Sequence, residues 1–110
     1  MMVKLNKKYV FHIPLYKYVA DELVSIDIGD IIDELVDDFS GNGFDSLYMT
    51  KIKSLYKSRM YDEVLITIFT DSGMFPEEIF ENWFRRNNHI MEQEAFAYEC
   101  GNEMMIERLY

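Results

Sequence analysis

The stretch from Ile28 to Phe39 constrains the fold most, because its apolar residues recur at the three- and four-residue spacing of one helical face. An Asp27 carboxylate before it can cap the exposed amides of the first turn, and the glycines at 41 and 43 provide a stop. We therefore expect an amphipathic helix with a polar side facing water. Acids fill that polar side: Asp27, Asp30, Asp33, Glu34, Asp37 and Asp38.

This helix lies in the most acidic part of the chain. Residues 18–50 contain nine acids and no Lys or Arg, while the whole protein carries a formal net charge of −9. Like charges four residues apart, such as Asp30/Glu34 and Asp33/Asp37, each cost about 0.2–0.5 kcal/mol in an isolated helix. Selection for stability alone would usually place a lysine among them, so the acidic face has two interpretations: a solvated surface or a binding surface.

Composition indicates one globular domain covering residues 1–110. The chain is 49% hydrophobic and 15% aromatic, which excludes a disordered acidic tail. Cys100 is the only cysteine, so no internal disulfide is expected and a cytoplasmic location is favoured. The apolar run near the N-terminus is interrupted by His12, Pro14 and Lys17, which is typical of neither a signal peptide nor a membrane span.

Alternation and β-branched runs predict strands on both sides of the acidic helix. Tyr9–Tyr16 alternates, and Pro14 places this strand at a sheet edge or ends it near that point. Ser46–Tyr56 reads as a strand with one wetter face, and Val64–Thr70 as a central strand ended by Asp71–Gly73. Tyr18–Ser25 remains open between a short helical turn and a loop.

The last third of the chain predicts a helix followed by a hairpin. Pro76 suits a first helical position, and Glu94–Cys100 and Glu103–Leu109 flank the turn signal Gly101–Asn102. The resulting element order matches the split βαβ pattern of ferredoxin-like domains. We therefore predict an α+β fold: a ferredoxin-like βαββαβ sandwich with an additional C-terminal strand and two helices on one face of an antiparallel sheet.

Few residues indicate chemistry. His12 and His89 lie on different predicted elements without metal-ligand spacing, and Cys100 is best explained as packing, so no catalytic residue, metal or cofactor is predicted. Direct nucleic-acid binding is disfavoured by a pI of about 4.6. A basic segment, Lys51 to Arg59, is consistent with a solvated hairpin tip, an inter-subunit contact or a complement to another molecule's acidic patch.

The acidic face leads to the main functional hypothesis. Carboxylates at three- and four-residue spacing lie about 5–6 Å apart, comparable with phosphates along a strand, and could occupy the cationic channel of a nucleic-acid-binding complex. We therefore expect a non-enzymatic inhibitor that mimics nucleic acid, of anti-CRISPR or anti-restriction type, with a basic protein as partner. Its partner-binding residues would be Asp27, Asp30, Asp33, Glu34, Asp37 and Asp38.

Two alternatives remain open. One is a small homodimeric α/β domain that binds a small molecule between sheet and helices, with a pocket lined by His12, Tyr48, Tyr98 and Glu99. The other is a small enzyme that uses His12 with a strand carboxylate or a tyrosine.

Overall fold

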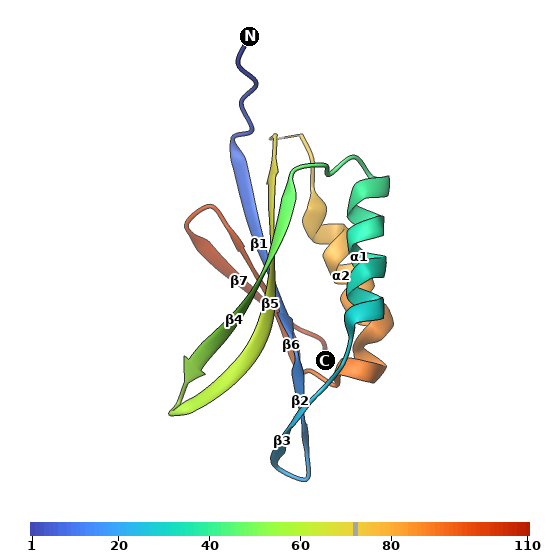
Figure 1. The fold of residues 1–110 in the computed structure, drawn as a ribbon, viewed down its shortest axis with the longest axis vertical. Coiled ribbons are helices and arrows are strands. Elements are labelled where there is room, and N and C mark those ends of the chain that lie inside the picture. Colours follow the sequence, from blue (N-terminus) through green and yellow to red (C-terminus); the bar gives the residue numbers. More distant parts are fainter. Residues whose placement is uncertain (72) are drawn as a thin grey trace.

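The computed structural model describes residues 1–71 and 73–110, and Ser72, part of the expected strand end at 71–73, lies outside them. Two helices and seven strands follow one another along the described residues (Figure 1). Their bounds are β1 Lys7–Pro14, β2 Tyr16–Val19, β3 Glu22–Ser25, α1 Gly29–Gly41, β4 Leu47–Tyr56, β5 Arg59–Thr70, α2 Pro76–Met91, β6 Ala95–Cys100 and β7 Glu103–Arg108.

The main sheet has five antiparallel strands in the order β4-β5-β1-β6-β7. Apart from β7, this is the strand order of a ferredoxin-like sandwich, so the predicted fold class, including the added C-terminal strand, is confirmed. Of the two alternatives expected for the first strand, the edge position is wrong, because β1 lies in the middle of the sheet, and an end near Pro14 is confirmed. Pro14 is its last residue, so the missing N–H ends the ladder without interrupting it.

The ambiguous segment at 18–25 is neither a helical turn nor a loop. It forms most of a separate two-stranded sheet, β2–β3, which projects below the main sheet (Figure 1). Ala20 and Asp21 form its turn in the left-handed region, with φ of 50° and 65°. Lys57 and Ser58 repeat this geometry between β4 and β5, with φ of 48° and 66°. Two consecutive left-handed residues suit the twist of a tight hairpin, although glycine and asparagine are the usual residues there.

Both predicted helices are present. Helix α1 begins one residue later than expected: Ile28 occupies the N-cap, and the Asp27 side chain accepts a 3.3 Å hydrogen bond from the Gly29 N–H. Pro76 is the first residue of α2, as predicted, and the helix ends at Met91, where Glu92 follows in the left-handed conformation as the C-cap. Neither of these described helices is long and apolar enough to cross a bilayer.

The helices cover one face of the sheet and leave the other uncovered (Figure 1). Tyr9, Phe11 and Ile13 of β1 point toward the helices, as their alternation predicted, and are almost fully buried. Trp83 joins the two helices, because its Nε1–H donates a 2.7 Å hydrogen bond to the Ile31 carbonyl. The other core side chains include Ile32, Leu35, Phe39, Phe44, Ile66, Ile68, Phe80, Phe84, Met91 and Phe96.

Candidate active site

A chain of polar side chains crosses the uncovered face over four neighbouring strands. Ser54 on β4 donates a hydrogen bond to Glu63 on β5. The other Glu63 oxygen, Oε1, lies 3.7 Å from Nδ1 of His12 on β1. The Nε2–H of His12 in turn donates a 2.7 Å hydrogen bond to Oε2 of Glu99 on β6. The sheet register therefore brings together four residues that are far apart in sequence.

Strand alternation explains why these side chains share a face. His12 pairs with Leu65 on one side and Ala97 on the other. Glu63 and Glu99 are each two residues from those partners, so their side chains project on the same side of the sheet as the imidazole. Phe11 and Ile13 alternate with His12 and enter the core.

The centre of this row of polar side chains is shielded from water. The side chains of His12 and Glu63 are only 17% and 16% exposed, whereas Glu99 is 41% exposed. The adjacent Glu63 carboxylate raises the pKa of His12, with help from Glu99 and against the effect of burial. In return, the adjacent His12 ring and then the Ser54 hydroxyl hold the pKa of Glu63 below its usual range, although burial opposes this. These directions favour an imidazolium between two carboxylates.

An open cleft of about 1010 Å³ lies between this row of polar side chains and the tips of the β2–β3 and β4–β5 hairpins. Four tyrosines and three glutamates contribute to its walls, and a smaller hollow of about 140 Å³ continues it to His12. The cleft is therefore both aromatic and acidic. Its lining is Tyr16, Tyr18, Ser54, Leu55, Tyr56, Tyr61, Glu63, Glu92, Gln93, Glu94, Ala95, Ala97 and Ile106.

Contacts between elements hold the tyrosine wall in place. The rings of Tyr16 and Tyr61 lie 4.8 Å apart, and the hydroxyl oxygens of Tyr18 and Tyr61 share a 2.8 Å hydrogen bond. Burial, followed by the nearby charge of Glu63, raises the pKa of Tyr16 to about 12, so this phenol stays neutral. Gln93 fixes the base of the wall by donating from Nε2 to the Tyr16 carbonyl at 2.8 Å.

This combination favours a particular ligand chemistry. Aromatic faces attract cations and stack on flat rings, while the ionised carboxylate of Glu63 adds negative charge at the buried end of the cleft. A flat ligand with a positive charge suits both features.

The predicted partner-binding residues lie elsewhere. Asp27 precedes α1, and Asp30, Asp33, Glu34, Asp37 and Asp38 lie on α1, on the helix-covered side of the sheet (Figure 1). The row is partly neutralised by the protein itself. Nη2 of Arg86 on α2 lies 2.6 Å from Oε1 of Glu34 and 3.1 Å from Oδ2 of Asp38.

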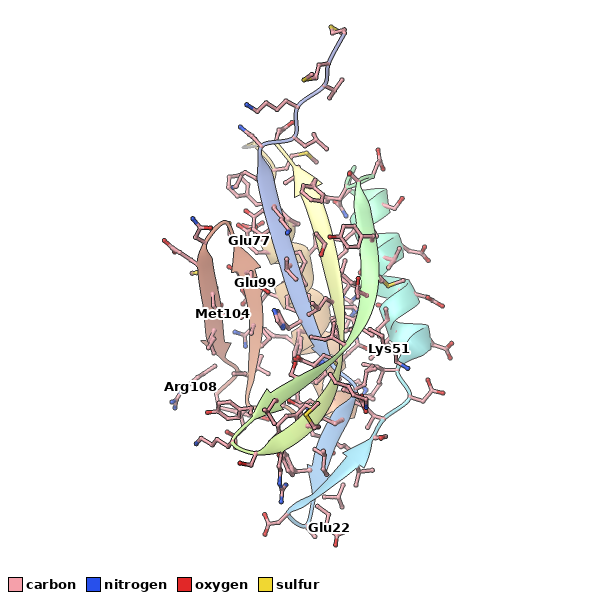
Figure 2. All side chains as sticks on the ribbon, turned by 60° about the vertical axis from the view of Figure 1, so that its left-hand side comes forward. Glu22, Lys51, Glu77, Glu99, Met104 and Arg108 are labelled. Atoms are coloured by element: carbon pink, nitrogen blue, oxygen red, sulfur yellow. The ribbon has the colours of Figure 1, made fainter. Side chains whose placement is uncertain are left out.

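Two of the four pocket residues considered from the sequence belong to the polar chain, namely His12 and Glu99; the latter is labelled in Figure 2. Tyr48 lies on the same face but further toward the Phe69 end of β5. The ring centroids of Tyr48 and Phe69 are 6.5 Å apart. Tyr98 faces the helices and contacts the ring of Phe11. The expected pocket between sheet and helices is wrong, because aromatic side chains of the core fill that space. Glu63, Ser54 and the tyrosine wall were not anticipated.

Comparisons with known proteins identify solved structures that share this fold. No family model and no curated protein sequence matches the chain. Solved structures of an enzyme do share its fold over nearly the whole length. A phage SAM lyase in the apo state has a TM-score of 0.62 at 14% identity, covering 98% of this chain and 95% of that chain. A phage SAM lyase in complex with S-methyl-5′-thioadenosine has a TM-score of 0.58 at 14% identity, covering 100% and 98%.

These findings correct the main functional prediction. The similar structures are those of an enzyme and not of an inhibitor, which contradicts the prediction of a non-enzymatic nucleic-acid mimic. The Arg86 bridge supplies a physical reason, because a cation inserted into the acidic row breaks the phosphate-like pattern. The likeness establishes that this chain shares its fold with an enzyme.

Proposed function

We propose that this protein is a small enzyme that binds an adenosyl sulfonium compound in the aromatic cleft and cleaves a carbon–sulfur bond, as a lyase acting on S-adenosylmethionine (SAM). One observation carries the proposal: four tyrosines and the shielded carboxylate of Glu63 line the same cleft. The shared fold with phage SAM lyase supports it, because one of those structures holds a methylthioadenosine.

The cleft chemistry suits both parts of such a substrate. Adenine is flat and aromatic, so it can stack on a tyrosine ring of the wall. The sulfonium is a cation without N–H donors, which is attracted to tyrosine π faces and to the charge of Glu63. Loss of the positive charge during cleavage weakens this attraction and favours release of a neutral thioether.

The reaction class requires no resident metal. The carbon–sulfur bond breaks, its electron pair returns to sulfur, and S-methyl-5′-thioadenosine leaves. The remaining carbon fragment completes its valence by losing an adjacent proton to a base or by bonding to its own carboxylate. In the first route Glu63 is the placed base, and in the second it stabilises the sulfonium while the substrate's carboxylate attacks.

Incubation of the full chain with SAM, followed by chromatography for S-methyl-5′-thioadenosine, tests the proposal. We expect product from the native protein and a loss of at least about 100-fold in Glu63→Gln, which removes the charge and retains the size. Glu103→Gln is a matched control, because this exposed glutamate lies at the β6–β7 turn, outside the cleft. Equal activity of Glu63→Gln and the control, or no product and no SAM binding by the native protein, would reject the proposal.

A further inference from the structure

Glu99 occupies an unusual place relative to the cleft. The cleft reaches Glu63 and the smaller hollow reaches His12, whereas Glu99 on β6, which is labelled in Figure 2, lines neither of them. Glu99 contacts the site through the 2.7 Å hydrogen bond that it accepts from His12 Nε2. Glu99 therefore reaches the cleft through the imidazole and not by direct contact with a ligand there.

The hydrogen bond to Glu99 determines which ring nitrogen of His12 faces Glu63. With Nε2–H donated to Glu99, the opposite nitrogen Nδ1 faces Glu63 Oε1 at 3.7 Å. A protonated ring turns a second N–H toward that carboxylate and attracts it. A neutral ring with the same Nε2–H bond turns a lone pair toward it and repels it. The Ser54 hydroxyl holds the other oxygen, so the carboxylate stays in line only while the ring is charged.

We infer that Glu99 is a positioning residue of the cleft, which through His12 keeps the Glu63 carboxylate ionised and oriented toward a cationic ligand without touching that ligand. This inference rests on the proposed function, because it assumes that a cation binds in the cleft. It adds a role for a residue outside the cleft wall.

The inference predicts a pH window for binding. The charged or titratable groups facing His12 or its Glu63 partner are Glu63 from β5, Glu99 from β6 and Tyr16 from β2. The pKa of Tyr16 is raised to about 12, so this phenol stays neutral throughout the measured range, and Glu63 and His12 set the window. Affinity for a cation falls on the acid side when Glu63 gains a proton. On the alkaline side, loss of the His12 proton also removes a positive charge that repels the ligand, so the inference requires that the lost alignment of Glu63 outweighs this gain. A rise in affinity at alkaline pH would overturn it.

Glu99→Gln separates charge from geometry. The glutamine carbonyl still accepts a hydrogen bond from Nε2, but the negative charge beside His12 is gone. The imidazolium is then less stabilised and loses its proton at a lower pH. The alkaline limit of binding moves with it, while the acid limit set by Glu63 moves little.

Calorimetric titration of the full chain at about pH 5 to 9 measures both limits, with a cationic SAM analogue in which an amine-bearing carbon replaces the sulfonium so that the ligand is not cleaved. We expect the alkaline midpoint in Glu99→Gln to lie roughly one pH unit lower than in the native protein, which is about threefold weaker binding halfway between the two midpoints and approaches about tenfold above both of them. Glu103→Gln controls for net charge and is expected to keep the native midpoint. Neutral S-methyl-5′-thioadenosine is expected to show a much weaker pH dependence in every variant.

A second measurement needs no ligand. The ring signals of His12, followed by NMR and assigned with a His89→Gln variant, give its titration midpoint in the free protein. A lower midpoint in Glu99→Gln than in Glu103→Gln supports the positioning role, and equal midpoints overturn it. Failure of the native protein to bind SAM would instead reject the proposed function, and the NMR midpoints would still decide whether Glu99 acts on His12.

Discussion

Replacing Trp83 with phenylalanine tests how the two helices are joined above the sheet. The indole is fully buried and its Nε1–H donates a 2.7 Å hydrogen bond to the Ile31 carbonyl on α1. Loss of this bond costs about 0.5–1.5 kcal/mol. The smaller ring adds about 1–2 kcal/mol, a fraction of the 3–5 kcal/mol typical of a buried Trp-to-Ala change. We therefore expect a loss of roughly 1.5–3.5 kcal/mol in unfolding free energy.

Urea denaturation followed by far-ultraviolet circular dichroism measures this loss, since the variant lacks the chain's single tryptophan. Tyr56→Phe is the control, because Tyr56 is 62% exposed at a hairpin tip, and a change within about 0.5 kcal/mol is expected there. A loss below about 1 kcal/mol for Trp83→Phe would refute the reasoning that this side chain couples α1 to α2.

Three further predictions concern charges and the cleft. Arg86→Gln is expected to change stability by less than about 1 kcal/mol in thermal unfolding, because its ion pairs with α1 are exposed and screened. Tyr18→Phe removes the hydroxyl pair with Tyr61, so hydrogen exchange of the β2–β3 amides is expected to be faster while β1 stays protected. The raised pKa of His12 stabilises the folded protein. This contribution to the free energy of unfolding is full below the unfolded-state pKa of about 6.5 and is lost as the pH rises through the folded-state pKa. The lowered pKa of Glu63 adds stability that is complete above its unfolded value and is lost as pH falls through the folded value. Chemical denaturation across pH is therefore expected to show a maximum in the native protein and a flatter alkaline side in His12→Gln.

Local patterns were sufficient to predict most of the fold. The period of the apolar residues between Ile28 and Phe39 identified α1, and the Gly101–Asn102 turn identified the last hairpin. The β2–β3 hairpin was missed because its turn consists of Ala20 and Asp21, which carry none of the usual glycine or asparagine signal. The central place of β1 depends on long-range pairing, which its own residues do not encode.

The site was less accessible to sequence reasoning, for a physical reason. Ser54, Glu63, His12 and Glu99 meet only through the register of four strands, and no spacing along the chain reveals that register. The sequence suggested His12 together with a strand carboxylate, but it did not identify Glu63 as that carboxylate, because Glu63 lies in a charged segment before the predicted strand at Val64. A partial signal was available, because Glu63 continues the period-two alternation of that strand. The acidic helix was predicted as the functional site instead, because its charged residues lie close together in the sequence.

Mapping a nucleoside onto the protein tests the central claim most directly. Addition of S-methyl-5′-thioadenosine to ¹⁵N-labelled protein is expected to shift backbone amide signals around the cleft, including Tyr16, Tyr61 and Ala97. The amides of α1, on the covered side of the sheet, are expected to stay unchanged. Shifts centred on α1, or none at saturating nucleoside, would contradict the assignment of the uncovered face as the ligand site.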